Sequence, residues 1–332
     1  MNLHPPHLDG VLAIDAGNSK TDVALVAADG TLLGTARGGG FAPQLHGPGA
    51  AVAGLAPLVA AAAAQAGVDP AGAPLVTHVQ ACLANADLPV EEQALAAALE
   101  AQGWGGSVAV ANDTFGLLRA GTDAPLGVAV VCGAGINCVG LLPDGRTARF
   151  AALGRLTGDW GGGGGLAREA MWFAARAEDG RGGPTALAAA IGEHFRLPGA
   201  LAVAEAIHLG TVAAERLHEL VPLIFSCAEA GDRVALELVD RQAAEITAMA
   251  RVALDRLDLL DAPAPLVLGG GVLAARHPLL LDRLRTRLAA VAPHAEPRIV
   301  TAAPVLGAAL LGLDRLGAGA DAQRRVRAAY GT

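Results

Sequence analysis

The first residues that could do chemistry lie in a loop of small polar side chains between two apolar stretches. The strand Leu12–Ile14 ends on the acid Asp15, and a second apolar stretch begins at Val23. The loop residues between them are Gly17, Asn18, Ser19, Lys20 and Thr21. Backbone N–H groups and hydroxyls in such a turn can bind an anion. A carboxylate at the end of the preceding strand can hold a hydrated cation, so the pattern is typical of a phosphate and magnesium site.

Lys20 is the single lysine of the chain, because the other 23 of its 24 basic residues are arginines. A GC-rich genome tends to replace exposed lysine with arginine, and it would have tended to replace Lys20 as well. The retained lysine indicates a place where a compact ammonium charge is needed on phosphate. An ordinary surface lysine is the alternative, and we favour the phosphate contact.

The same pattern returns about 120 residues further along the chain, which indicates an internal repeat. The strand Val128–Val131 leads into a second glycine-rich turn, and Asp144-Gly145 repeats the hairpin signal of Asp29-Gly30. The turn residues are Gly133, Ala134 and Gly135. One glycine-rich turn is weak evidence, but two in equivalent places predict two similar domains, each with a turn that binds phosphate.

A candidate base lies where the predicted strand Ser107–Ala111 ends at Asn112 and Asp113. Ligands collect beyond the carboxyl ends of strands in open α/β sheets, and Asp15, Asp87 and Asp113 all follow predicted strands. A hydroxyl nucleophile needs a carboxylate within hydrogen-bond reach to accept its proton, and Asp113 is the best candidate for that role. The alternative is that Asp113 caps the following helix, a role whose loss costs about 1 kcal/mol.

A run of five glycines, Gly161–Gly165, separates Asp159-Trp160 from a predicted helix over Leu166–Ala177. Glycines in that number permit the close approach of a ligand and a movable loop. We therefore expect a site loop here rather than a plain linker.

A further glycine run follows the predicted strand Pro265–Leu268. Its members are Gly269, Gly270 and Gly271. Bare backbone at this place would let a flat ring or a ribose lie on it, and a tight turn is the alternative.

Strands alternate with helices along the chain, which predicts an α/β fold with parallel strands, to which the hairpins add antiparallel ones. Helices are expected over Gly49–Gly67 and Val90–Gln102. Nearly all of Pro184–Asp258 is expected to be helical, and its last helix has one apolar face. That face consists of Val239, Ala243, Ile246, Ala250, Ala253 and Leu257. Packing explains this region, and we assign it no chemistry.

Composition and charge argue against several classes of protein. The net charge of −8 and the pI near 5.6 disfavour nucleic acid or an anionic membrane as partner. No basic region followed by an apolar run opens the chain, and no stretch of about 18 bulky apolar residues occurs. The four cysteines form no C-x-x-C pair, so buried thiols are expected rather than a zinc or iron–sulfur site. We expect a soluble cytoplasmic protein without a signal peptide or membrane contact.

Taken in order, the motifs resemble the actin-like ATPase superfamily of sugar kinases, and most closely the BadF/BadG/BcrA/BcrD-type group that includes N-acetylglucosamine kinases. The segments that carry the resemblance are Asp15–Thr21, Asn112–Thr114, Gly133–Cys138, Gly158–Gly163 and Leu268–Val272. It covers nearly the whole chain. It implies an α/β, duplicated actin-like ATPase (ribonuclease H-like) fold with ATP and Mg²⁺ in a cleft between two domains. The expected domains are 1–120, with 306–332 packing back on it, and 121–305 with a helical insertion.

The resemblance also implies roles for individual residues. The first turn would contact the β- and γ-phosphates, with Asp15 toward Mg²⁺ and Asp113 as the general base. The turn Gly133–Gly135 would contact phosphate from the other side, and Gly269–Gly271 would contact adenosine. The candidates for contact with the sugar are Asn137, Asp159, Asn112 and Gln44. Departures from the family pattern around Gly40–Gln44 and at Trp160 fall in this expected sugar pocket.

The implied reaction is ATP-dependent phosphorylation of an amino sugar, N-acetylglucosamine or glucosamine, to its 6-phosphate, by a homodimer. One alternative is an ATPase that activates a radical dehydratase or reductase and carries an iron–sulfur cluster. Cys132 and Cys138 lie in and beside the second turn, where a cluster would obstruct the nucleotide. Another alternative is a non-catalytic sensor of sugar or nucleotide, which could lose Lys20 and Asp113 without penalty.

Overall fold

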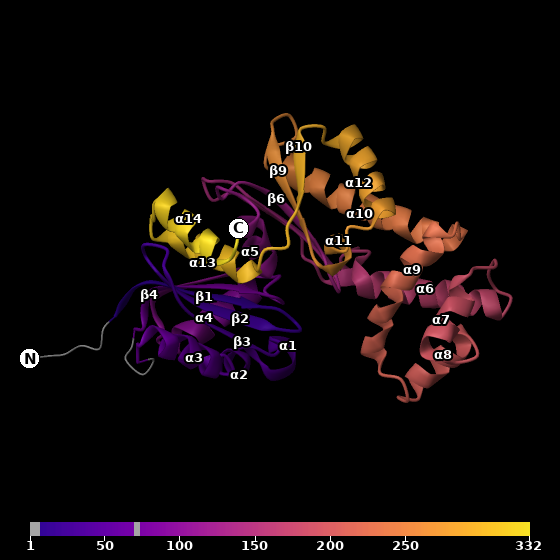
Figure 1. Ribbon diagram of the computed structural model, residues 1–332, viewed down its shortest axis with the longest axis horizontal. Coiled ribbons are helices and arrows are strands. Elements are labelled where there is room, and N and C mark those ends of the chain that lie inside the picture. The colour runs from indigo at the N-terminus through magenta and orange to yellow at the C-terminus, as the bar shows by residue number, and fades with distance from the viewer. Residues whose placement is uncertain (1–6, 70–73) are drawn as a thin grey trace, which may run out of the picture. The chain divides into compact units, whose positions relative to one another are not determined.

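The computed structural model describes residues 7–69 and 74–332 (Figure 1). The expectation of no signal peptide depends partly on residues 1–6, which lie outside these described ranges. The described residues form two compact units. Unit 1 contains those up to Ala129 together with Val139–Ala151 and Val300–Thr332, and unit 2 contains Val130–Cys138 and Ala152–Ile299.

Unit 1 is built on a five-stranded mixed sheet with the strand order β3-β2-β1-β4-β5. The strands are β1 (Leu8–Ala16), β2 (Thr21–Ala27), β3 (Leu32–Gly38), β4 (Val76–Leu83) and β5 (Gly105–Asn112). The first three are antiparallel, whereas β4 and β5 run parallel to β1. The predicted hairpin turn at Asp29-Gly30 is confirmed, since Gly30 has a φ of 86° and the Thr31 N–H donates to the Asp29 carboxylate.

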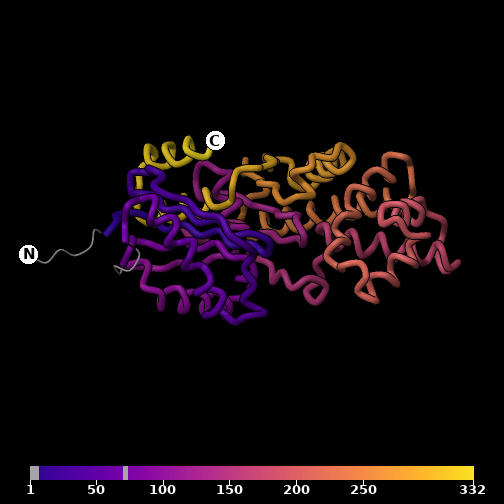
Figure 2. Tube along the Cα trace, turned by 60° about the horizontal axis from the view of Figure 1, so that its bottom comes forward, coloured from indigo at the N-terminus to yellow at the C-terminus, as the bar shows by residue number. Residues whose placement is uncertain are grey.

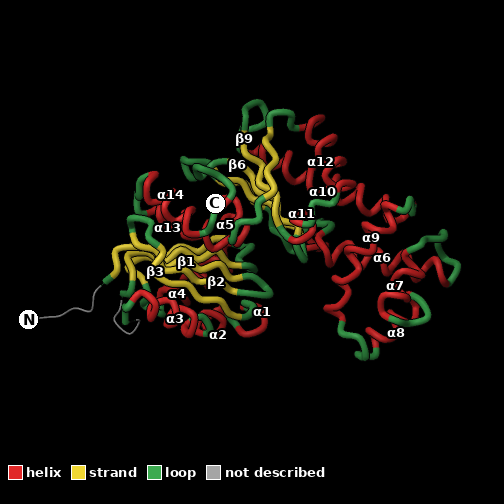
Figure 3. The backbone as a smooth tube through the Cα atoms, viewed as in Figure 1, coloured by secondary structure: helices red, strands yellow, loops and turns green. Residues whose placement is uncertain are grey.

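Side chains alternate between the two faces of this sheet and enter two separate cores. Leu12, Ile14 and Val23 pack on one side with α2 (Pro48–Ala53), α3 (Ala56–Ala66) and α4 (Pro89–Glu100). The other core contains residues of β1 and β2 and of the C-terminal helices α13 (Pro304–Arg315) and α14 (Ala320–Ala329). Figure 2 shows these yellow helices on one side of the indigo strands and the purple helices on the other, and Figure 3 shows the same layers by secondary structure.

The helix predicted over Gly49–Gly67 is two helices, α2 and α3, separated at Gly54-Leu55. Pro57 explains the break, because proline lacks the N–H that a continuous helix requires and fits only a first turn. Pro48–Ala66 is also the one stretch, among the residues described, whose length and apolar composition would allow it to cross a membrane. Its residues Val52, Val59, Ala62 and Ala63 belong to the hydrophobic core on this side of the sheet.

The second sheet has the strand order β10-β9-β6-β7-β8. Its strands are β6 (Gly127–Cys132), β7 (Ile136–Leu141), β8 (Thr147–Arg149), β9 (Ala264–Gly269) and β10 (Ala295–Ile299). The pair β9/β10 is parallel and the hairpin β7/β8 is antiparallel. The α/β class and the repeated glycine-turn hairpin are thus as the sequence predicts.

Unit 2, which contains β9, β10 and parts of β6 and β7, is otherwise largely helical. Its helices are α6 (Gly162–Glu178), α7 (Leu187–Phe195), α8 (Ala200–His208), α9 (Leu220–Glu229), α10 (Arg233–Arg256), α11 (Gly271–Ala274) and α12 (Pro278–Val291), with short 3₁₀ turns over Gly154–Leu156 and Ala214–Glu219. The predicted apolar face of α10 is confirmed, because Val239, Ala243 and Ile246 are fully buried. The movable loop expected at Gly161–Gly165 is wrong, since four of the five glycines form the first turn of α6.

Candidate functional site

The loop between β1 and β2 is a tight turn that glycine makes possible. The Gly17 N–H donates to the Lys20 carbonyl at 2.8 Å, and the Phe41 N–H donates to the Gly17 carbonyl at 2.9 Å. A Cβ on Gly40 would lie 2.1 Å from the carbonyl oxygen of Asn18, so this backbone approach requires glycine. The glycine-rich segment after β3 thus holds the turn from one side, as its place in the sequence suggests.

Two acids from β1 and β2 face each other beneath this turn. Asp15 and Asp22 are cross-strand neighbours, and both side chains are buried. Arg37 donates to both carboxylate oxygens of Asp22, at 2.6 and 3.0 Å, and the half-exposed Lys20 ammonium lies 3.8 Å from Asp22. Asp22 and Arg37 were not among the residues expected here. The hairpin pattern could have indicated Asp22, because it pairs with Asp15 across the turn and paired residues lie on the same face of a sheet.

The pKa of Asp15 is raised from 3.8 to about 7, first by burial and then by the negative charges of Asp113 and Asp22. The positive charges of Lys20 and Arg37 act in the opposite direction and do not cancel this effect. A buried carboxylate that lacks sufficient positive charge fits a cation site. Within 7–69 and 74–332 no group of three or more metal-binding side chains occurs. Mg²⁺ usually takes one or two carboxylates and completes its shell with water and phosphate oxygens.

Asp113 is the first residue of α5 (Asp113–Ala120) and follows directly on β5. The alternative that it caps this helix is wrong, because Asn112 is the cap: its side-chain oxygen accepts the Thr114 N–H at 3.0 Å. The Asn112 amide also donates to Asp87 at 2.8 Å, so this candidate sugar residue is buried and engaged in the fold. The Asp113 carboxylate is only partly buried, and burial raises its pKa.

Gln44 lies in the short helix α1 (Pro43–His46) beside a cavity of about 230 Å³. Asn85 lines the same cavity with a left-handed backbone (φ 65°) and donates from its amide to the Asn18 side chain at 2.8 Å. The cavity therefore adjoins the phosphate-type turn, and Asn85, which like Asp87 follows a predicted strand, is a polar residue at its edge.

The second turn, between β6 and β7, is embedded in backbone. Its Gly133 N–H donates to the Gly135 carbonyl at 3.0 Å. Two N–H groups at the start of α6 donate to carbonyls of this turn. Gly163 donates to the Gly133 carbonyl at 2.7 Å, and Gly164 donates to the Ala134 carbonyl at 2.9 Å. A Cβ on Gly270 would lie 2.5 Å from the backbone of Cys132. Three glycine runs that the sequence treats separately therefore meet at one place, where they pack closely instead of forming a movable loop.

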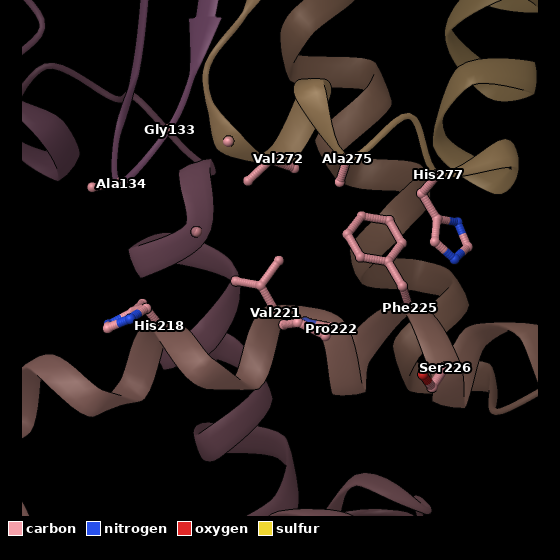
Figure 4. Close-up of a pocket in the computed structure, with 12 residues that line it drawn as sticks. Gly133, Ala134, His218, Val221, Pro222, Phe225, Ser226, Val272, Ala275 and His277 are labelled. Atoms are coloured by element: carbon pink, nitrogen blue, oxygen red, sulfur yellow. The ribbon is translucent and has the colours of Figure 1, made fainter.

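A cavity of about 550 Å³ opens beside this turn (Figure 4). Its walls are mostly apolar, with Val221, Pro222 and Val272 around it and Phe225 stacked on His277 at 4.3 Å. The His277 Nε2 lies 3.1 Å from the Glu229 carboxylate. A flat, mostly apolar ring fits such walls. No chemistry was expected in α9 or in the 3₁₀ turn before it, and these residues follow no motif by which they could have been found.

The remaining sugar candidates, Asn137 and Asp159, also lie in unit 2. Asp159 accepts a hydrogen bond from the Thr157 hydroxyl at 2.6 Å and is partly buried. Asn137 accepts the N–H of Cys138 at 2.7 Å. All four cysteines are buried and free, as predicted. Burial raises the pKa of Cys132 to about 12 and that of Cys138 further, so both thiols keep their protons.

These turns and the repeated hairpin belong to the actin-like sugar-kinase fold. Residues 12–312 match the BadF/BadG/BcrA/BcrD ATPase family, so the chain belongs to that family, as its motifs predict. A solved structure from Chromobacterium violaceum, assigned as a candidate N-acetylglucosamine kinase, is similar with a TM-score of 0.71 and 26% identity. The similarity covers 93% of this chain and 100% of that one.

Two sugar kinases are similar in sequence over shorter stretches. The chain is 30% identical over 210 residues to the N-acetyl-D-glucosamine kinase of Dictyostelium discoideum, which is 61% of this chain and 64% of that protein. It is 25% identical over 190 residues to the N-acetylmuramic acid/N-acetylglucosamine kinase of Clostridium acetobutylicum, which is 57% of this chain and 62% of that protein. The matched region is thus slightly under two thirds of the length of each.

Proposed function

We propose that the protein is an ATP-dependent kinase that phosphorylates an amino sugar, N-acetylglucosamine or glucosamine, at its primary hydroxyl to give the 6-phosphate. The observation that carries the proposal is the set of acids in unit 1, where Asp15 and Asp113 interact electrostatically and both have raised pKa values beside a phosphate-type turn. Membership of an ATPase family and the sugar-kinase relatives support it.

Asp113 is the proposed general base. Phosphoryl transfer needs in-line positioning and neutralised charge more than covalent chemistry from the protein. A carboxylate accepts the proton of the attacking hydroxyl best when its pKa lies nearer the operating pH, and burial moves Asp113 in that direction. Asn112 rather than Asp113 caps the helix, and the one printed side-chain contact of the Asp113 carboxylate is a long hydrogen bond of 3.5 Å from the Thr114 hydroxyl.

Asp15 is the proposed Mg²⁺ residue, and the backbone of Gly17–Thr21 with the Lys20 ammonium would hold the β- and γ-phosphates. When bound, the ion would supply positive charge to the phosphate oxygens and to the buried carboxylates. Arg37 pairs with both oxygens of Asp22, whereas its charge only partly offsets the burial of Asp15. This difference between the two neighbouring acids supports Asp15 rather than Asp22 as the metal residue.

The cavity beside the second turn is the proposed site of the nucleotide base. Its apolar walls and the stacked Phe225 and His277 suit a purine, and Gly269–Gly271 would pass close to the ribose. The N–H groups of Ala134 and Gly135 are proposed for phosphate, because the Gly133 N–H is used within the turn. The proposed sugar contacts stay Asn137, Asp159, Gln44 and Asn112. We also propose that the protein is a homodimer. The proposed domains are 1–120 together with 306–332, and 121–305.

The buried thiols weigh against the radical-activator alternative. A cluster needs thiols that it can reach, and Cys132 and Cys138 are both fully buried inside the fold. Cys138 also donates to the Met249 carbonyl inside unit 2. Neither thiol is therefore suited to bind a cluster in this fold.

The test is a coupled ADP-release assay with Mg-ATP and a panel of sugars. The panel contains N-acetylglucosamine, glucosamine, N-acetylmannosamine, N-acetylmuramic acid and glucose. We expect turnover with at least one amino sugar, and a 10²–10⁴-fold lower kcat in Asp113→Asn, which is roughly the contribution of a general base. Asp261→Asn, which changes an exposed acid of unit 2, is the matched control and should keep the wild-type rate. ADP release without sugar, or none with the whole panel, would contradict the proposal.

A further inference from the structure

Unit 2 contains a second cavity, of about 430 Å³, whose walls carry an unusual set of side chains. They come from the segment before α6, from α6 itself and from α10. The lining residues are Arg155, Trp160, Arg168, Glu169, Trp172 and Arg241. We call this set the arginine pocket. Three guanidinium groups and two indoles around one cavity are a strongly positive and donor-rich combination, and neither the phosphate turns nor the base cavity uses any of them.

The arginine pocket offers hydrogen-bond donors almost exclusively. Guanidinium groups donate and cannot accept. The single carboxylate, Glu169, is already paired with Arg155. Neither Arg168 nor Arg241 makes a salt bridge with any residue in the described ranges 7–69 and 74–332. The pocket is therefore complementary to a group with several acceptor atoms and negative charge.

Trp160 is the second, independent observation. Its side chain is 6% exposed, and its buried indole N–H has no hydrogen-bond partner among the residues that the structure describes. Leaving a buried donor unpaired costs about 1–3 kcal/mol, so Trp160 is an energetically costly residue in the wall of the arginine pocket. The Arg241 guanidinium lies 4.2 Å from the centre of the Trp160 ring, which holds the cation at the pocket wall.

The arginine pocket adjoins the residue that the resemblance assigns to sugar hydroxyls. Trp160 follows Asp159 directly, and consecutive Cα atoms are about 3.8 Å apart. Glu245, one turn along α10 from Arg241, is influenced by the charges of both Arg241 and Asp159, which places all three near one another. Asp159 itself is fixed by Thr157. A substituent on a sugar held by Asp159 could therefore reach the arginines.

We infer that the arginine pocket is an oxyanion subsite, with Arg168 and Arg241 as binding residues, that takes a carboxylate substituent of the acceptor sugar or a free phosphate. The carboxylate source rests on the proposed function. A phosphate could bind here whether or not the protein is a kinase. It predicts that an amino sugar bearing a carboxylate on an ether side chain binds better than the same sugar without it.

Intrinsic fluorescence gives a test that is independent of turnover, since two of the three tryptophans of the chain line the arginine pocket. The purified protein is titrated with N-acetylmuramic acid, with N-acetylglucosamine and with inorganic phosphate. The inference expects saturable binding of at least one anion. In Arg168→Gln and in Arg241→Gln that binding should weaken roughly tenfold or more, the usual effect of losing a hydrogen bond from a charged donor. Arg251→Gln, ten residues along the same helix as Arg241 and outside the cavity, should bind as wild type.

The outcomes separate the sources and the two proposals. Tighter binding of N-acetylmuramic acid than of N-acetylglucosamine, lost in the arginine variants, supports the carboxylate source. Binding of phosphate alone, also lost in the variants, supports the subsite and overturns the carboxylate source. Binding of neither anion, or equal binding in all variants, overturns the subsite, and the ADP-release assay then still decides the kinase proposal by itself. Anion binding without turnover on any sugar would leave the subsite supported and contradict the kinase.

Discussion

The two glycine-rich turns share a sequence pattern, but their surroundings differ. The turn in unit 1 lies over the charged residues Asp15, Asp22 and Arg37, with Lys20 half exposed in the turn itself. The turn in unit 2 has no charged side chain in Gly133–Gly135 and is held by backbone hydrogen bonds from α6 and by close contact with Gly270. The comparison indicates that one copy is suited to charge and proton chemistry, whereas the other supplies a rigid wall beside an apolar cavity.

This difference follows from what lies opposite each turn. In unit 1 the neighbouring strands β2 and β3 contribute Asp22 and Arg37, so ionisable groups gather on one face of the sheet. In unit 2 the partners are the first turn of α6 and the start of α11, which are mostly glycine. A duplicated element thus keeps its backbone pattern while its neighbours determine the chemistry.

The largest expected effect concerns Asp15 beneath the turn of unit 1. It is a change in the pH dependence of the free energy of unfolding. The Asp15 pKa of about 7 in the folded state exceeds its ordinary value of 3.8. The folded protein therefore binds this proton more tightly than the unfolded chain does, and the contribution of Asp15 to stability falls as pH rises from about 4 to about 7. A shift of about 3 pKa units corresponds to a loss of about 4 kcal/mol over that window.

Asp15→Asn should remove most of this pH-dependent loss, and urea denaturation in metal-free buffer at pH 4.5 and pH 7.5 measures it. Asp29→Asn is the control, because the pKa of this exposed acid is lowered, mainly by hydrogen bonds from Thr31. That variant should keep the wild-type fall in stability between the two pH values. An equal fall in Asp15→Asn would show that Asp15 does not have a raised pKa, and it would weaken the metal assignment with it.

Sequence reasoning recovers the two turns, because glycine, strand-end acids and the Asp-Gly hairpin signal are local features. It finds Asp113 and Asp15 for the same reason. It misses Asp22 and Arg37, whose importance depends on cross-strand pairing, and it misses Phe225 and His277, which come from a helical region read as packing. It also mistakes Gly161–Gly165 for a loop, since a glycine-rich helix start is stable only when tertiary hydrogen bonds, here to Gly133 and Ala134, offset the low helix propensity.

The stability of the closely packed turn Gly133–Gly135 should depend on side-chain volume rather than on charge. Gly270 has a φ of 87°, and an added Cβ would lie 2.5 Å from the Cys132 backbone. Gly270→Ala should therefore lower the free energy of unfolding by about 3 kcal/mol, from backbone strain and the forced displacement of β6. Gly271→Ala is the matched control, because a Cβ there meets no atom within 4 Å. Chemical denaturation of both variants would decide the matter, and equal stability would mean that the close packing of this turn has no energetic consequence.

The smallest effect should be on the apolar cavity beside the packed turn. Phe225→Leu keeps apolar volume in α9 but removes the flat ring that stacks on His277. Stacking of a base on an aromatic ring contributes about 1–3 kcal/mol, so the KM for ATP should rise roughly tenfold while the KM for the sugar stays the same. Phe195→Leu, whose ring contacts Arg216 outside the cavity, should leave both values unchanged. If the KM for the sugar rose instead, the cavity would belong to the acceptor, and the division between a charged turn for phosphate and an apolar wall for the base would fail.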